Sequence, residues 1–211
     1  MRTIEVFADV LCPFTHVGLH TLMDRRRERG QDEPRMRIRA WPLELINGAP
    51  LDPDHIAAEI VALRASVRPD LFSGFTTETF PNTSMDAFAL TAAADRTGDP
   101  VLIEEVGMAL RDAVFEQGLD IGRSEVVQTL ADRFGLTPLD ADATEAAVRA
   151  DWAEGKRRGV VGSPHFFTHD GGGWFCPGLA ISRDEAGAFV VAWKEGSQAF
   201  VDSVFSERAN D

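Results

Sequence analysis

The first side chain suited to chemistry is Cys12, which stands in the run Asp-Val-Leu-Cys-Pro-Phe-Thr-His of residues 9–16. This run follows an apolar segment typical of a strand and begins a segment typical of a helix. At a helix N-terminus the backbone N–H groups are unpaired and the helix dipole is positive, and both favour a thiolate. Because the thiolate is the reactive form of cysteine, the position predicts a nucleophile with a pKa below that of a free thiol. Pro13 fits the first helical turn, where its missing N–H costs nothing.

Thr15 stands three residues after Cys12, so the spacing is that of a Cys-Pro-x-Cys redox motif whose second cysteine is replaced. In such motifs the second thiol resolves a mixed disulfide from within the protein. Threonine lacks this chemistry, but its hydroxyl group can donate a hydrogen bond to the Cys12 thiolate and lower the pKa further. The motif therefore predicts mixed disulfides on Cys12 without a complete dithiol cycle.

Cys176, the second of the two cysteines, stands just before Pro177 and Gly178. Two interpretations are open. The thiol is either a buried structural group or a substitute resolving thiol, which would require the two cysteine Cα atoms to lie within about 7 Å. The separation in sequence does not decide between them.

Three ionisable residues flank Cys12 in sequence. Asp9 suits either a polar cap at the end of the strand or a proton shuttle, and His16 suits an electrostatic neighbour of the thiol. His16 and His20 share one face of the helix, but no further ligand is apparent beside them in the sequence. We therefore expect no metal site.

Composition and charge exclude several classes of protein. The chain has 211 residues, of which 44% are hydrophobic and 26% are charged, and its net charge is −13. Such a charge argues against nucleic-acid binding, and the basic run at 25–29 fits the last turn of a helix. No signal-like segment begins the chain, and no stretch approaches the roughly 20 apolar residues of a membrane span. We expect a cytoplasmic protein without a structural disulfide and without a membrane or nucleic-acid partner.

The segments that must position Cys12 follow the order β-α-β, then helices only, then β-β-α. The first part predicts a strand over 3–7, a helix over 13–29 and an alternating strand over 36–43. Only helical patterns follow, including a capping box at Thr83 and Asp86, a helix capped by Ser124, and a last helix over 140–158.

The C-terminal part predicts a hairpin of strands over 166–168 and 174–176. A capping box at Ser182 and Glu185 then predicts a closing helix that includes Trp193. This pattern gives an α/β fold with one sheet. The predicted division is a sheet domain and an all-helical insertion: 1–52 with 159–211, and 53–158.

Two motifs together resemble the DsbA-like thioredoxin superfamily: Cys-Pro-Phe-Thr at 12–15, and Gly-Val-Val-Gly-Ser-Pro-His-Phe-Phe at 159–167. The resemblance covers essentially the whole chain and is nearest to the FrnE-type cytosolic oxidoreductases with a helical insertion. It implies a thioredoxin-like fold and a cis peptide bond between Ser163 and Pro164 that lies against Cys12. The exposed backbone of Ser163 would then pair with an extended substrate.

The related kappa-class glutathione transferases and 2-hydroxychromene-2-carboxylate isomerases also lack the second cysteine, but they carry serine at the first position. This chain keeps the thiol and therefore falls between the groups. The resemblance implies a thiol-disulfide oxidoreductase in which Cys12 is the nucleophile and Thr15 stabilises the thiolate. The residues expected to bind substrate are Pro13, Phe14, His16, Ser163, Pro164 and His165.

Two alternatives stay open. One is a kappa-class-transferase-like or isomerase-like enzyme that uses a bound small thiol, and the other is a non-catalytic thioredoxin-like binding protein. We expect no tightly bound cofactor, and the expected partners are a disulfide-containing substrate and glutathione or another low-molecular-weight thiol. The sequence leaves open whether the protein is a monomer or a homodimer.

Two further segments have possible roles at the substrate. His165 follows Pro164 and either lines the substrate groove or points outward from an edge strand. The segment 72–77, Phe-Ser-Gly-Phe-Thr-Thr, has few helix signals and two aromatic residues. We interpret it as an apolar lid over the substrate.

Overall fold

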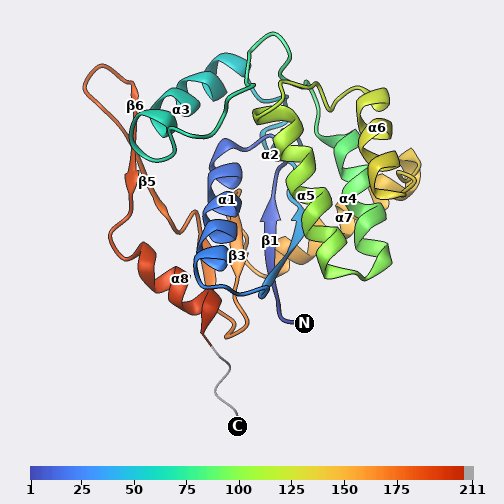
Figure 1. Ribbon diagram of the computed structural model, residues 1–211. Coiled ribbons are helices and arrows are strands. Elements are labelled where there is room, and N and C mark those ends of the chain that lie inside the picture. Colours follow the sequence, from blue (N-terminus) through green and yellow to red (C-terminus); the bar gives the residue numbers. More distant parts are fainter. Residues whose placement is uncertain (207–211) are drawn as a thin grey trace.

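A four-stranded sheet in the order β2-β1-β3-β4 forms the frame of the molecule (Figure 1). The computed structural model describes residues 1–206. β1 pairs in parallel with β2 and antiparallel with β3, and β3 pairs antiparallel with β4. The strands are β1 (Thr3–Ala8), β2 (Arg35–Ala40), β3 (His165–Phe167) and β4 (Gly173–Phe175).

Helix α1 (Pro13–Glu28) connects the two parallel strands, as predicted. Six helices then separate β2 from β3: α2 (Leu43–Asn47), α3 (Pro53–Ser66), α4 (Met85–Thr97), α5 (Pro100–Phe115), α6 (Ser124–Phe134) and α7 (Ala141–Arg157). The predicted α/β fold with helices inserted between two strands is confirmed. One hydrophobic core joins the inserted helices to α1 and to the residues around Cys12, and the division into two domains stays a prediction.

The two faces of the sheet are covered by different elements because side chains alternate along each strand. Val6 of β1 packs in a cluster with Leu19 of α1 and Phe200 of the last helix. Its neighbour Phe7 points to the other face, where it contacts Trp41 edge-on at 6.3 Å between ring centroids. The strand that precedes Cys12 is therefore buried on both faces, which fixes where α1 begins.

The predicted closing helix through Trp193 is wrong. Residues 179–193 form a two-stranded hairpin of β5 (Leu179–Arg183) and β6 (Phe189–Trp193), and helix α8 (Ser197–Phe205) follows it. The carboxylate of Asp184 accepts hydrogen bonds from the backbone of Ala186 and Ala188 and closes the turn. Gly187 there has a φ of +84°, which suits glycine.

The hairpin packs against α3, away from the main sheet (Figure 1). The hydroxyl group of Ser66 donates a hydrogen bond to the carbonyl of Val191. His55 contacts the Phe189 ring edge-on at 5.1 Å between centroids. These contacts hold residues 179–193 beside the helix that covers the N-terminal end of α1.

Two of the predicted helix caps are wrong. Thr83 lies outside α4, where its hydroxyl oxygen accepts from the Met85 N–H at 3.1 Å and its hydrogen bond to Glu44 replaces a capping box. Ser124 is the first residue of α6 and does not cap it. Asp140, in contrast, caps α7 by accepting from the Ala143 N–H at 2.8 Å.

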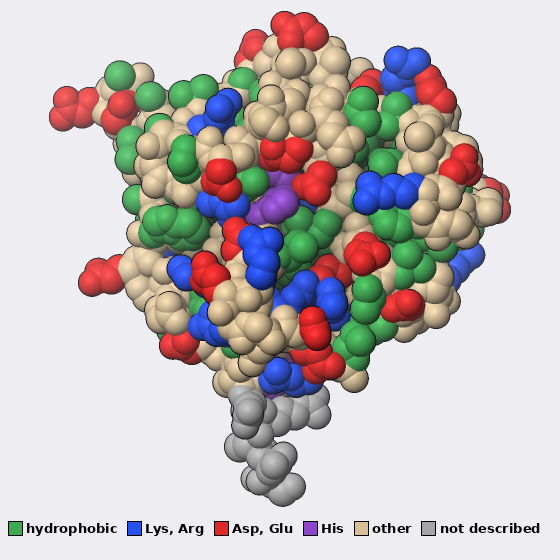
Figure 2. Space-filling model, viewed as in Figure 1, with side chains coloured by type: hydrophobic (Ala, Val, Ile, Leu, Met, Phe, Trp, Pro, Cys, Tyr) green, Lys and Arg blue, Asp and Glu red, His purple; other side chains and the backbone are tan. Residues whose placement is uncertain are grey.

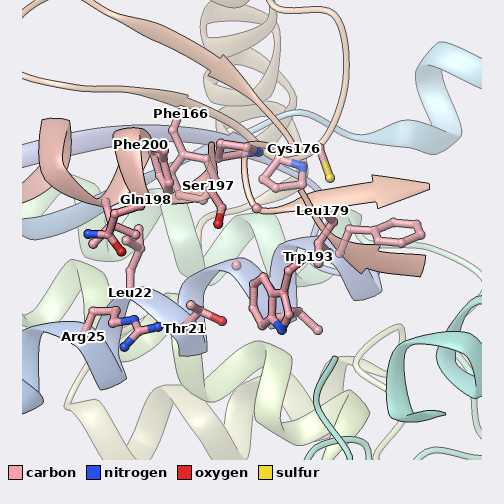
Figure 3. Close-up of a pocket in the computed structure, with 17 residues that line it drawn as sticks. Thr21, Leu22, Arg25, Phe166, Cys176, Leu179, Trp193, Ser197, Gln198 and Phe200 are labelled. Atoms are coloured by element: carbon pink, nitrogen blue, oxygen red, sulfur yellow. The ribbon is translucent and has the colours of Figure 1, made fainter. Parts of the chain in front are cut away.

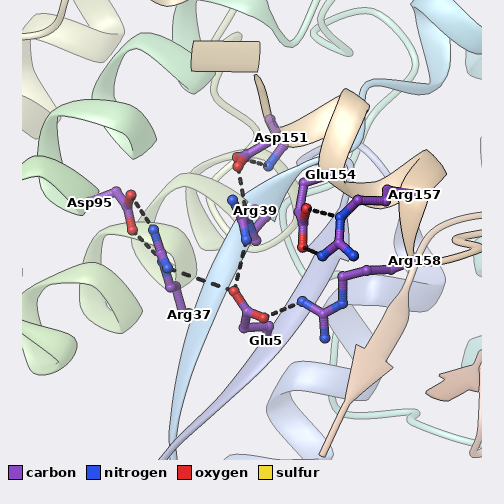
Figure 4. A network of polar contacts seen from close by, with 9 residues as sticks. Glu5, Arg37, Arg39, Asp95, Asp151, Glu154, Arg157 and Arg158 are labelled. Atoms are coloured by element: carbon purple, nitrogen blue, oxygen red, sulfur yellow. Dashed lines mark hydrogen bonds and ion pairs between the residues drawn. The ribbon is translucent and has the colours of Figure 1, made fainter. Parts of the chain in front are cut away.

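Ion pairs fasten the inserted helices to the edge of the sheet (Figure 4). Arg39 of β2 bonds Glu5 of β1 at 2.9 Å and Asp151 of α7 at 2.8 Å. Arg37, two residues earlier, binds Asp95 of α4 through two hydrogen bonds of 2.7 Å. Because β2 presents arginines on one face only, both helices are held against the same side of the strand. Within residues 1–206 no helix is both long and apolar enough to cross a membrane.

Glu104 of α5 forms the most buried ion cluster of this interface. Its side chain is 2% exposed and binds Arg26 of α1 at 2.6 and 2.8 Å, Arg35 at 3.0 Å and the backbone N–H of Met36 at 2.8 Å. Removing one member of a buried ion pair leaves the other charge unpaired in a site without water.

We predict that Glu104→Gln lowers the free energy of unfolding by about 3–5 kcal/mol. Guanidinium-induced unfolding measures the change. Glu105→Gln, at the exposed neighbouring position, is the control and should change the stability by less than about 0.5 kcal/mol. Equal effects of the two substitutions would contradict the role of the buried cluster.

Candidate active site

Cys12 is the N-cap of α1 and lies against the turn that enters β3. Pro13 occupies the first helical turn, as expected. The Cys12 thiol donates a hydrogen bond of 3.3 Å to the carbonyl oxygen of Ser163. The peptide bond between Ser163 and Pro164 is cis. Cys12 and Ser163, which lie 151 positions apart in the sequence, therefore meet at the N-terminus of α1.

The Ser163 side chain joins the thiol motif to the end of β1. Its Oγ accepts a hydrogen bond from the Asp9 N–H at 2.9 Å and lies 2.9 Å from the Thr15 hydroxyl oxygen. Thr15 is fully buried and its hydroxyl group bonds this serine. The residue that replaces a second cysteine therefore holds the cis-proline turn against α1.

The predicted low pKa of Cys12 is wrong. Burial raises the pKa of the thiol above its ordinary value, because the charged form loses its water. Hydrogen bonds from Thr15 and Ser163 lower the pKa, but their combined effect is smaller. Cys12 is only 3% exposed, so the desolvation outweighs the helix N-terminus that suggested a thiolate.

Asp9 is a buried cap, one of the two roles that the sequence allowed. Its carboxylate accepts hydrogen bonds from the Leu11 N–H at 2.8 Å and from the Leu43 N–H at 2.6 Å. Burial raises the pKa of Asp9 to about 6 even though these bonds oppose it. The side chain thus fixes Leu11, the residue before Cys12, and Leu43, the first residue of α2.

Arg111 of α5 is a buried residue near the site that the sequence analysis missed. Its guanidinium group is fully buried and donates hydrogen bonds to the carbonyls of Gly107 at 2.8 Å and Asp9 at 3.2 Å. Burial lowers the pKa of Arg111 to about 10. Arg111 lies on the inward face of α5, as its helical spacing from Gly107 and Glu104 indicates. This spacing is the sequence pattern from which its burial could have been predicted. A charge on an inward face indicates a partner in the interior.

The rings of the two histidines expected at the substrate bind groups other than the Cys12 thiol, although the His16 backbone N–H donates a hydrogen bond to the Cys12 carbonyl at 3.2 Å. The His16 ring bonds Glu116, the residue that follows α5, at 2.8 Å. His165 stacks on Phe167 at 4.8 Å between ring centroids, and burial lowers its pKa. His165 and Phe167 share one face of β3, whereas Phe166 points to the other face, toward α1. The His165 side chain is therefore buried beside Phe167. It neither lines a groove nor points outward into solvent, the two positions that the sequence left open.

Cys176 is a buried thiol beside the cis-proline. Its N–H donates to the Pro164 carbonyl at 2.9 Å, and its φ is +40°. Burial and the nearby Cys12 thiol raise the pKa of Cys176 to about 12. Neither cysteine is in a disulfide. This environment is that of a structural thiol.

A pocket of about 170 Å³ opens beside Pro164 and Phe14 (Figure 3). Apolar side chains form most of its wall, and they come from α1, β3, the hairpin and α8. These include Phe14, Leu22, Phe166, Cys176, Trp193 and Phe200. Polar groups of Arg25 and Gln198 lie at the end away from Cys176 and Leu179. An elongated, mainly apolar small molecule would fit this arrangement.

The segment 72–77 does not form the predicted lid over this pocket. Phe72 is buried in the core with Phe115, and its N–H donates to Glu116 at 2.6 Å. Gly74 packs so closely on the backbone of residues 116–117 that a Cβ atom would lie 2.5 Å from it. Leu179 and Trp193, which belong to the hairpin, form the pocket wall instead.

A comparison of the sequence with known protein families identifies the family of this chain. A family model described as the DSBA-like thioredoxin domain matches residues 3–180. The chain belongs to this family. The match ends at the start of the hairpin, so most of β5, all of β6 and α8 lie outside it. No match was found among functionally curated proteins.

Several solved structures share the fold of this chain, although their sequence identity to it is low. A probable DsbA oxidoreductase from Streptomyces coelicolor is 17% identical, with 100% of this chain and 93% of that chain covered and a TM-score of 0.59. The cytosolic disulfide reductase DsbM from Pseudomonas aeruginosa, solved with GSH, is 16% identical over 80% and 86%, with a TM-score of 0.56. A 2-hydroxychromene-2-carboxylate isomerase is 14% identical over 82% and 88%, with a TM-score of 0.55.

We predict that the alkylation rate of Cys12 rises with pH to a midpoint above the roughly 8.5 of a free thiol. The measurement is iodoacetamide labelling followed by mass spectrometry in a Cys176→Ser background. Thr15→Val should move the midpoint higher still, because the hydroxyl group lowers the Cys12 pKa. Thr21→Val, further along α1, should leave it unchanged. A wild-type midpoint below the free-thiol value would show that the thiol is hydrated in solution.

Proposed function

We propose that this protein is a thiol-disulfide oxidoreductase that works through Cys12 alone, in the cytoplasm, on small disulfides or thiols. The observation that carries the proposal is the 3.3 Å contact between the Cys12 thiol and the Ser163 carbonyl, beside a cis-proline and at the N-terminus of α1. Membership of the DSBA-like family supports the general chemistry, and Thr15 restricts it to one thiol.

The reaction is an exchange in two steps. Cys12 gives up its proton, its thiolate attacks one sulfur of a disulfide, and the other sulfur leaves as a thiolate that takes up a proton. A second small thiol then attacks the mixed disulfide, so that Cys12 leaves as a thiolate and is protonated again. Electrons balance because one disulfide is broken and one is formed. No resolving thiol within the motif is needed.

Three groups of the chain have roles in this reaction. In the resting state the Ser163 carbonyl accepts a hydrogen bond from the Cys12 thiol, which fixes the orientation of the sulfur. Thr15 and Ser163 oppose the rise in pKa that burial causes. Pro164 and Phe14, the neighbours of these residues, line the pocket that would hold the small substrate.

In this structure the thiol is covered, and the reaction requires the covering groups to move. Cys12 belongs to the same hydrophobic cluster as Ile56 and Ile60 of α3 and Val191 of the hairpin. The hairpin is attached to α3 through the Ser66 hydrogen bond and the contact of Phe189 with His55. A loosened hairpin would expose the thiol to a substrate in the pocket.

Intact-mass analysis after incubation with oxidised glutathione tests the proposal. We predict one glutathione adduct on the wild type and on Cys176→Ser, and none on Cys12→Ser. The adduct should disappear when reduced glutathione is added, which completes the exchange. A loss of two protons without an adduct would indicate a Cys12–Cys176 bridge and contradict a single-thiol reaction. No adduct on the wild type, in a protein shown to be folded, would contradict the proposal as well.

A second candidate is an enzyme that binds a small thiol without forming a bond to it. The pocket favours it, since Arg25 and Gln198 offer polar groups at the end away from Cys176 (Figure 3). Under this function Cys12→Ser keeps both glutathione binding, measured by calorimetry, and turnover of an electrophilic substrate. The oxidoreductase loses its activity with the same substitution, so one variant separates the two.

A further inference from the structure

Helices α1 and α5 bring together two histidines and two carboxylates that no step of the proposed reaction uses. His16 and His20 are four residues apart on α1, Asp112 lies on α5, and Glu116, four residues later, caps the C-terminus of α5. The helices pack side by side. His16 bonds Glu116 and His20 bonds Asp112, each at 2.8 Å. The sequence shows both pairs but not that they face each other.

One ligand atom from each of His16, His20 and Asp112 lies within 4.8 Å of the other two. Within residues 1–206 this is the only group of three such residues. Imidazole nitrogens and a carboxylate oxygen suit zinc and neighbouring divalent transition metals. Three protein ligands from two helices leave a further position for water, as open zinc sites do.

Glu116 orients His16 from outside this group of three. Its carboxylate accepts hydrogen bonds from the N–H groups of Phe72 and Ser73, and one of its oxygens lies 2.8 Å from the His16 Nε2 atom. An ionised carboxylate only accepts hydrogen bonds, so the His16 Nε2 atom carries a proton and donates it. Carboxylates that hold a ligating histidine in this way are a regular feature of metal sites.

The other ring nitrogen of His16 has no partner. His16 is fully buried, and its Nδ1 atom makes no hydrogen bond. With the proton on Nε2, the Nδ1 atom of a neutral ring keeps its lone pair. A buried polar atom without a partner is costly. A bound metal ion would provide the missing interaction.

The surroundings favour a cation and give it access. The side chains of His20 and Asp112 are 21% and 33% exposed. A histidine is visible in a hollow near the middle of one face of the molecule, with both acidic and basic side chains around it (Figure 2). The neighbouring cation Arg68 is shared between Asp24 and Asp70, at 3.2 and 2.7 Å, and within the described residues it forms no ion pair with Asp112.

We propose that His16, His20 and Asp112 bind one divalent transition-metal ion, Zn²⁺ in the first instance, between α1 and α5. The sequence analysis expected no metal because the two histidines lacked a further ligand, and Asp112 supplies it from another helix. The ion would fasten α5 to the helix that begins at Cys12. This inference does not depend on the proposed function.

Equilibrium dialysis of the untagged, chelator-treated protein against Zn²⁺ tests the site, and Co²⁺ absorption reports its ligands. We expect one ion per chain, a rise in the melting temperature with metal, and cobalt bands without a sulfur-to-metal charge-transfer band. His20→Gln keeps a hydrogen-bonding group toward Asp112 but is a poor ligand, and it should weaken binding about tenfold or more. Asp112→Asn should do the same.

His55→Gln is the matched control. Like His20, His55 lies near a carboxylate, that of Glu59 at 3.6 Å, but it belongs to no group of three possible metal ligands. Its substitution should leave Zn²⁺ affinity unchanged. The proposal is overturned if the wild type binds no Zn²⁺, if His55→Gln weakens binding as much as His20→Gln, or if Cys12→Ser abolishes binding. The last result would place the ion on the thiol.

Discussion

The contact between Ser163 and the start of α1 is the interaction on which the site depends. The backbone carbonyl of Ser163 accepts from the Cys12 thiol, and its side chain bonds both the Asp9 N–H and the Thr15 hydroxyl group. One residue therefore fixes the end of β1, the thiol and the first turn of α1. Because this residue enters β3, a strand that pairs with β1, the sheet sets the distance between the thiol and the proline.

Water, more than the helix dipole, sets the acidity of this thiol. The dipole and a few hydrogen bonds each contribute about 1 kcal/mol, within a factor of two. Removing a charged group from water costs several kcal/mol. At Cys12 the second effect is the larger, and the pKa rises. A position that is favourable in an exposed motif therefore gives a protonated thiol when other elements cover it.

The sequence predicted the elements that depend on local patterns. The strand before Cys12, the extent of α1 and the helical run after β2 all follow from periodicity and turn residues. The hairpin at 179–193 was missed because Ser182 and Glu185 have the spacing of a capping box. In the structure, Asp184 and Gly187 instead form the turn between β5 and β6. A local pattern that suits two structures is decided by packing, here against α3.

The parts of the site that the sequence did not reveal are those that depend on contacts between distant elements. The cover over Cys12 comes from α3 and the hairpin, and Arg111 and Asp112 come from α5. No spacing within α1 indicates which of these groups it will meet. The placement of His16 depends likewise on Glu116 and Phe72, which turn its ring toward α5.

Acidity and access of Cys12 are linked, because the same side chains control both. Ile56, Ile60 and Val191 share the cluster that excludes water from the sulfur. Any movement of the hairpin that lets a substrate reach the thiol also lets water reach it, and water stabilises the thiolate. The thiol is thus protonated when covered and more acidic when open. Since the family match ends where the hairpin begins, the contribution of Val191 to this coupling lies outside the family pattern, whereas Ile56 and Ile60 lie within it.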